Sequence, residues 1–133
     1  MLDVLWIVGA MERADECVVP DAQFYIDHSE SPLSAAEHVD TIQQYHIQTR
    51  FTRIEVLEFA ALDDERCYIR IKCDLHIKVI DAYCHMYVTI LLKARDDRVA
   101  ECRYIVDRYA MLGELGALPE DAYYLALAGE KFT

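Results

Sequence analysis

The chain has few basic residues and no apolar run long enough for a membrane span. Its 133 residues include 13 Lys and Arg against 24 Asp and Glu, which gives a formal net charge of −11. An acidic chain repels phosphate backbones, so we do not expect a nucleic acid as a partner. The apolar run Leu5–Met11 is far shorter than the roughly 20 residues that a bilayer requires, and Met1-Leu2-Asp3 lacks the basic start of a secretory signal. We therefore expect a soluble, cytoplasmic protein with no membrane contact.

Paired cysteines and linker sequences are also missing. The five cysteines form no C-x-x-C pair, and their odd number favours reduced, buried thiols over a disulfide framework or a zinc site. No stretch rich in proline, glycine and serine divides the chain, and no repeat has solenoid spacing. The length is that of one domain of roughly 100–150 residues. We predict a single domain over residues 1–133.

The residues that are present alternate between apolar and polar over long stretches. From Cys67 to Val79, apolar side chains occupy every second position, which is typical of a strand with one face in water. A second strand is expected at 83–94, and if Ile80 pairs with Tyr83, the apolar residues of both strands share one face. Further strands are expected at 22–27, at 51–60 and at 99–110. A one-residue bulge at the preceding turn would exchange the two faces of the last strand.

Three helices complete the predicted pattern. The first covers 2–17, the second runs over 35–48 behind a capping box formed by Ser34 and Glu37, and the third follows Pro119. Amphipathic strands need a helix over their apolar face. We therefore predict an α+β fold in which a curved antiparallel sheet forms a cone packed on the N-terminal helices.

Two segments resemble the nuclear transport factor 2-like superfamily, in particular ketosteroid isomerase and the SnoaL-like polyketide cyclases. They are D-A-Q-F-Y-I-D-H-S-E-S-P at 21–32 and A-R-D-D-R-V-A-E-C-R-Y-I-V-D at 94–107. The resemblance implies proton transfer next to a carbonyl, without a cofactor. It places Asp27 where the isomerase has its general base and Asp107 where the cyclases have an acid. The stretch 86–90 has no acid where the isomerase has one, so the resemblance does not imply the standard steroid-isomerising donors.

The candidate catalytic residues are Asp27, His28 and Asp107. An acid next to a histidine at the end of a strand is suited to be a base with a proton partner, or else Asp27 only stabilises a turn while His28 lies in solvent. Asp107, close in sequence to Arg103, Tyr104 and Arg108, is either an acid at the rim of a pocket or half of a surface ion pair.

The candidate substrate contacts are two tyrosines and three residues of the inner sheet face. Tyr45 and Tyr104 are expected to orient a carbonyl oxygen. The aliphatic residues Ile71, Met86 and Val88 are expected to contact an apolar small molecule, although residues of this type more often only form a core.

Three further residues look like a metal or catalytic cluster, namely Asp74, His76 and His85. The predicted register puts them on the outer, wet face, where we expect a homodimer interface, and we predict no metal and no cofactor. His46 fits either a core histidine or a group in the pocket.

Two classes of function stay open. One is an isomerase, cyclase or dehydratase that acts on an apolar carbonyl compound. The other is a non-catalytic module that binds an apolar ligand or a protein partner, and a dimerisation domain with a filled interior is a third option. A buried Asp27 with a raised pKa that faces a cavity would favour the enzyme, whereas a solvated turn acid would favour the binder.

Overall fold

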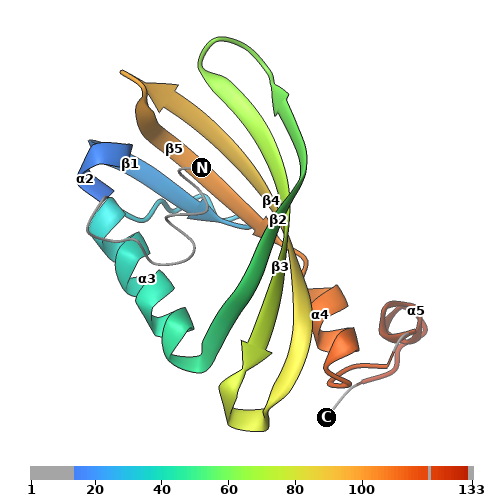
Figure 1. The fold of residues 1–133 in the computed structure, drawn as a ribbon. Coiled ribbons are helices and arrows are strands. Elements are labelled where there is room, and N and C mark those ends of the chain that lie inside the picture. Colours follow the sequence, from blue (N-terminus) through green and yellow to red (C-terminus); the bar gives the residue numbers. More distant parts are fainter. Residues whose placement is uncertain (1–13, 120, 132–133) are drawn as a thin grey trace.

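The computed structural model describes residues 14–119 and 121–131, so most of the helix expected over 2–17 lies outside the described residues. The elements, in chain order (Figure 1), are α2 (Ala14–Cys17), β1 (Val18–Ile26), α3 (Ala35–Gln48), β2 (Thr49–Ala61), β3 (Arg66–Ile77), the 3₁₀ turn η2 (Lys78–Ile80), β4 (Ala82–Arg95), β5 (Arg98–Val106), α4 (Arg108–Glu114) and α5 (Ala122–Leu127). None of the helices in these residues is long and apolar enough to cross a membrane.

The strands form one strongly twisted sheet in the order β1-β5-β4-β3-β2. Four strands are antiparallel, but β1 runs parallel to β5, which places Phe24 beside Cys102. The sheet is therefore mixed, and the prediction of a purely antiparallel sheet is wrong, because the short first strand pairs with the last strand rather than with a sequence neighbour. The helix α3 covers one face of the sheet, whereas α4 lies beside β4, past the end of β5, and α5 lies farther out (Figure 1).

The core is built from the inner face of the sheet. Phe24, Ile71, Leu75 and Ile90 are each at most 1% exposed, which confirms the predicted apolar face of the two long central strands. Four of the five cysteines are buried, as predicted. Burial raises the pKa of one of them, Cys73, to about 12, so this thiol stays protonated and packs as an apolar group.

The register of the hairpin between β3 and β4 differs from the predicted one. Leu75 pairs with Cys84, and the expected pair of Ile80 and Tyr83 does not form. The cause is the turn, because Ile80 ends the 3₁₀ turn and Asp81 then adopts a left-handed φ of 47°. The shift is an even number of residues, so the apolar side chains keep their predicted face.

The bulge considered for the last hairpin is present. Residues 96 and 97 both have positive φ, which is the two-residue turn that suits the twist of a hairpin. The pairing then shifts between Lys93 and Ala94. As a result Val99 is buried on one side of the shift, and Tyr104, rather than Arg103, is buried on the other.

The strand expected over 99–110 ends at Val106, and a helix that the sequence did not predict follows. The side chain of Asp107 accepts a hydrogen bond from the backbone N–H of Ala110 (3.0 Å) and caps the start of α4. Because β5 ends opposite Val88, the remaining edge of β4 is open to α4. There the N–H of Asp107 donates to the carbonyl of Tyr87 (3.0 Å).

Candidate ligand site between α3, the sheet and α4

A cavity of about 290 Å³, here called the inner cavity, lies between α3, the inner face of the sheet and α4. Most of its surface is apolar. The apolar lining residues are Ile26, Ile42, Phe51, Met86, Val88, Val106, Met111 and Leu112, and the polar ones are His38, Thr41, Tyr45, Tyr104 and Arg108. Such a cavity suits an apolar molecule that has a few polar groups at fixed positions.

His38 forms the deepest polar part of the lining. Its ring, on α3, is 1% exposed and stacks between Phe24 (centroids 4.2 Å apart) and Tyr104 (5.1 Å). Burial lowers the pKa of His38 to about 4, so the ring is neutral at physiological pH. The capping box at Ser34 fixes the start of α3, one turn before His38, and so fixes the face that this ring occupies.

Tyr45 contributes a phenol from the next turns of the same helix. Its hydroxyl lies 3.5 Å from the sulfur of Met86. Burial raises the pKa of Tyr45, the Cys84 thiol raises it further, and the Arg108 guanidinium opposes both. The phenol therefore stays protonated and can donate a hydrogen bond to a ligand oxygen.

Asp27 lies where β1 ends, at the side of the inner cavity. One carboxylate oxygen accepts a hydrogen bond from the backbone N–H of Val106 (3.1 Å), and the other accepts one from the guanidinium of Arg108. The carboxylate is 38% exposed and contacts Arg108 rather than the cavity itself. The adjacent His28 is exposed.

Solved structures of known proteins share the fold of this chain. No protein-family model matches the sequence, and no curated protein matches it. IdmH from Streptomyces antibioticus, a candidate polyketide cyclase, aligns over 86% of this chain and 93% of its own, with 19% identity and a TM-score of 0.72. A SnoaL-like polyketide cyclase from Agrobacterium tumefaciens aligns over 86% and 91%, with 15% identity and a TM-score of 0.71.

The chain has the nuclear transport factor 2-like fold. The resemblance inferred from residues 21–32 and 94–107 is thereby confirmed at the level of the fold. Another structure with this fold, an LEH-like epoxide hydrolase from M. tuberculosis, covers 96% of the chain with a TM-score of 0.66 and 13% identity. Because the neighbours include cyclases and an epoxide hydrolase, the nuclear transport factor 2-like fold does not by itself select a reaction.

Four of the five predicted substrate contacts line the cavity, namely Tyr45, Tyr104, Met86 and Val88. The fifth, Ile71, is fully buried in the core cluster and is not part of the lining. The catalytic roles assigned to Asp27, His28 and Asp107 stay predictions.

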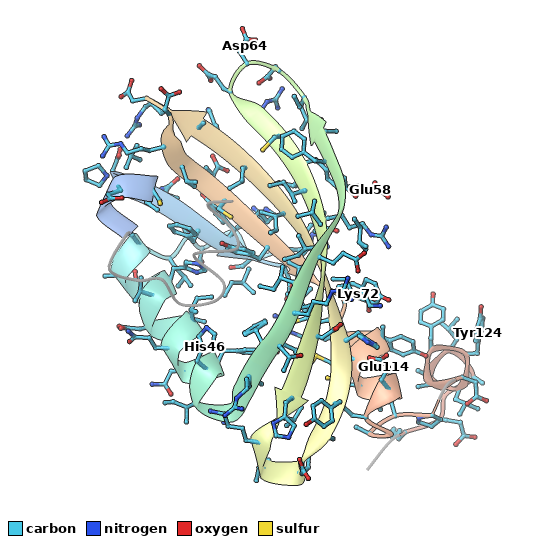
Figure 2. The ribbon with its side chains drawn as sticks, in the orientation of Figure 1. His46, Glu58, Asp64, Lys72, Glu114 and Tyr124 are labelled. Atoms are coloured by element: carbon cyan, nitrogen blue, oxygen red, sulfur yellow. The ribbon has the colours of Figure 1, made fainter. Side chains whose placement is uncertain are left out.

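Asp107 and His46 have structural contacts of their own. The carboxylate of Asp107 is used as the cap of α4, next to the lining residue Arg108. His46 lies on α3, on the opposite side of the sheet from Lys72 and Glu114 (Figure 2). Its ring packs edge-on against Phe51 (centroids 5.1 Å apart) and is not part of the lining.

Sequence reasoning missed His38 and Met111, and it named Arg108 only as a neighbour of Asp107. His38 follows Ala35 by three residues and precedes Ile42 by four, so helical spacing alone would have placed it on the buried face. Arg108 was assigned to the strand expected over 99–110, and Met111 follows directly after that range. The signal for a helix was Asp107, an acid in the position of an N-cap.

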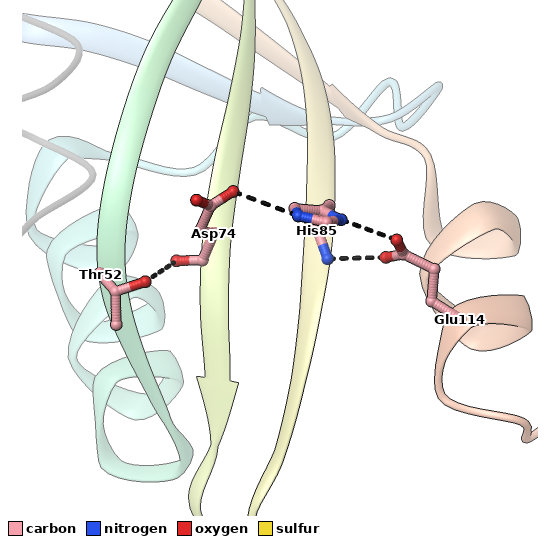
Figure 3. Close-up of polar contacts among 4 residues, drawn as sticks. All are labelled: Thr52, Asp74, His85 and Glu114. Carbon is pink, nitrogen blue, oxygen red and sulfur yellow. Dashed lines mark hydrogen bonds and ion pairs between the residues drawn. The ribbon is translucent and has the colours of Figure 1, made fainter.

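The outer face carries a second group of polar residues, here called the outer cluster: Asp74, His85 and Glu114 (Figure 3). Glu114 accepts hydrogen bonds from the His85 backbone (2.6 Å) and contacts its ring nitrogen Nδ1 (2.7 Å), and Asp74 lies 3.5 Å from Nε2. His76 pairs separately with Asp81 (2.7 Å). The predicted placement on the outer face is confirmed, and within the described residues no group of three His, Cys, Asp or Glu side chains is placed to hold a metal ion.

Proposed function

We propose that the inner cavity binds an apolar small molecule with a carbonyl oxygen, and that the chain transfers a proton next to that oxygen. The observation that carries the proposal is the protonated phenol of Tyr45 inside an apolar cavity of about 290 Å³. Structural neighbours described as a polyketide cyclase and as candidate isomerases support the reaction class.

The chemistry requires an oxygen donor and a proton acceptor. Removal of a proton next to a carbonyl leaves negative charge on the oxygen, and a preorganised donor in a dry site stabilises that charge. Tyr45 is the donor in this proposal, and the neutral ring of His38 adds a second polar contact. Asp27, which lies at the side of the inner cavity, is the carboxylate that accepts the proton in this proposal.

A second candidate function is ligand binding without turnover. The observation in its favour is the position of Asp27, whose carboxylate is partly exposed and hydrogen-bonded to Arg108 and Val106 instead of facing the cavity. A carboxylate that already accepts these two hydrogen bonds and does not line the cavity is poorly positioned to take a proton from a ligand there.

The test uses 2-tetralone, an apolar ketone whose protons next to the carbonyl exchange with deuterium. We expect 2-tetralone to raise the melting temperature of the protein. We also expect the protein to accelerate the exchange of these protons, which NMR in D₂O follows. Removal of one oxyanion donor costs roughly 10²–10³ in rate, so Tyr45→Phe should slow exchange by about that factor. Tyr87→Phe, on the outer face, is the matched control.

The outcomes separate the two candidates. Asp27→Asn should abolish the acceleration and leave the melting shift. A melting shift without any acceleration in the wild-type chain would favour the binding module, and the absence of both would contradict the cavity as a ligand site.

The outer face supports the further proposal of a homodimer. Tyr68 and Tyr87 lie there among charged side chains, with the ammonium of Lys72 6.0 Å from the ring centre of Tyr87. Tyrosines of this kind are common in interfaces. Light scattering after size exclusion should give twice the 15.4 kDa of one chain, and a monomeric mass would contradict the proposal.

A further inference from the structure

We infer that Arg108 makes the inner cavity selective for apolar molecules that carry one anionic oxygen group, such as a carboxylate, an enolate or a phenolate. The inference rests on the proposed function of the cavity as a ligand site. It goes further by naming the residue that recognises the polar end of the ligand and the charge that this end carries.

The first argument is the position of Arg108 at the start of α4. Among the described lining residues it is the one with a permanent charge, because His38 is neutral and the other polar members are hydroxyl groups. Its charge acts inside the cavity, since it lowers the pKa of the Tyr45 phenol against the larger, opposite effect of burial. In a chain with a formal charge of −11, this guanidinium is a local exception that attracts an anion.

The second argument is how firmly the partner of Arg108 is held. The backbone N–H of Asp27 donates to the carbonyl of Tyr104 (2.7 Å), and its own carbonyl accepts from Arg103 (2.7 Å). Val106 donates to one oxygen of the carboxylate, and the other oxygen meets Arg108. These bonds fix Asp27 at a φ of 54°, a left-handed conformation that residues other than glycine adopt uncommonly.

The third argument is the geometry of the guanidinium. It has five N–H donors in a planar fork, and the contact with Asp27 uses one terminal nitrogen, Nη1. The second terminal nitrogen can therefore donate to a ligand oxygen while Asp27 keeps the first in place. The Val106 N–H occupies the other oxygen of Asp27, and both side chains of the pair are partly exposed.

The test compares two probes of the same shape, 2-naphthoate and the neutral 2-naphthamide, by isothermal titration calorimetry. We expect the wild-type chain to bind 2-naphthoate at least tenfold more tightly. In Arg108→Gln, the affinity for 2-naphthoate should fall to the affinity for 2-naphthamide, and the affinity for 2-naphthamide should stay unchanged. The matched control is Arg95→Gln, because Arg95 also pairs with an aspartate, Asp21, and is about equally exposed but lies outside the lining.

The wild-type measurement is decisive even if Arg108→Gln fails to fold. Equal affinities for the two probes in the wild-type chain would overturn the inference and leave the proposed ligand site standing. Binding of neither probe would overturn the ligand site and the inference with it. A preference for naphthoate that persists in folded Arg108→Gln would also overturn the inference, because the selectivity would then arise elsewhere.

Discussion

His38 in the inner cavity and His85 in the outer cluster are the same residue type in two environments. The ring of His38 lies between two aromatic rings, and burial keeps it neutral. The ring of His85 lies between two carboxylates, Asp74 and Glu114, which belong to β3 and α4. The first is held by stacking in a dry site and the second by polar contacts that connect the edge of β4 to a helix.

The difference shows that the side of the sheet, more than the spacing of residues in sequence, decides what a polar residue does here. In the sequence, Asp74, His76 and His85 look like a metal or catalytic cluster, yet they lie on the outer face. The lone His38 lines the cavity instead. The outer cluster connects β4 to α4, which also carries the lining residues Met111 and Leu112, so we expect a change in the cluster to affect the cavity.

The largest expected effect comes from the acid titration of His38. Its pKa is about 4 in the folded chain, below the ordinary 6.5, so the unfolded chain binds more protons between these values. The free energy of unfolding should therefore fall as the pH drops from about 6.5 to about 4, by roughly 3 kcal/mol from this residue alone. Urea denaturation at several pH values measures the loss.

Carboxylates also titrate in this range, so the comparison needs a variant that lacks the imidazole. His38→Phe keeps an aromatic ring between Phe24 and Tyr104 and removes the titrating group. The difference in unfolding free energy between wild type and variant should change by roughly 3 kcal/mol between pH about 6.5 and pH about 4. A constant difference from pH 7 to pH 4 would show that burial does not hold the ring neutral.

A smaller effect is expected when the outer cluster is broken. Burial alone would raise the pKa of Glu114, but its hydrogen bonds with His85 lower it. Glu114→Ala removes these bonds and should cost about 1 kcal/mol of unfolding free energy, since the group is partly exposed. The affinity for 2-naphthamide should fall too, because α4 loses a contact with β4.

The control is Glu55→Ala, an exposed glutamate on β2. It should change the unfolding free energy by less than about 0.5 kcal/mol and leave the naphthamide affinity unchanged. An effect of Glu114→Ala on stability without any effect on affinity would break the proposed link between the outer face and the cavity.

The smallest effect is expected at the pair of His76 and Asp81. The two side chains are 2.7 Å apart, but that of Asp81 is 85% exposed. Asp81→Asn keeps a residue type that tolerates the left-handed φ at this position, and exposed pairs contribute little. Thermal and urea unfolding should show a change below about 0.5 kcal/mol, and a loss comparable to that of Glu114→Ala would refute the distinction between the two pairs.

Local rules predicted much of the fold. The capping box at Ser34 and Glu37 predicted α3 at its observed bounds, because both reciprocal hydrogen bonds depend on neighbours in sequence. Period-two alternation predicted the inner face even where the register was wrong. The parallel pairing of β1 with β5 was beyond such rules, because it joins residues 78 or more positions apart, such as Ile26 and Tyr104.

The candidate site was predictable where strand alternation reaches it, as at Met86 and Val88. It was not predictable at Arg108, because the sequence of residues 107–110 fits either a strand or a helix. In the structure, the side chain of Asp107 caps a helix there. The contact of Asp27 with Arg108 depends on the ends of β1 and β5 meeting, which the sequence alone does not reveal.

The irregularity between Lys93 and Ala94 has a consequence for how this chain can diverge. It determines which side chains of β5 point inward, and it consists of a single extra residue. Deletion of the extra residue would leave Tyr104 opposite Ile90, whereas pairing of the full strand without the irregularity would put Arg103 there. This exposed hairpin, remote from any ligand, can therefore lose one residue without a change in the side chains that β5 gives to the cavity.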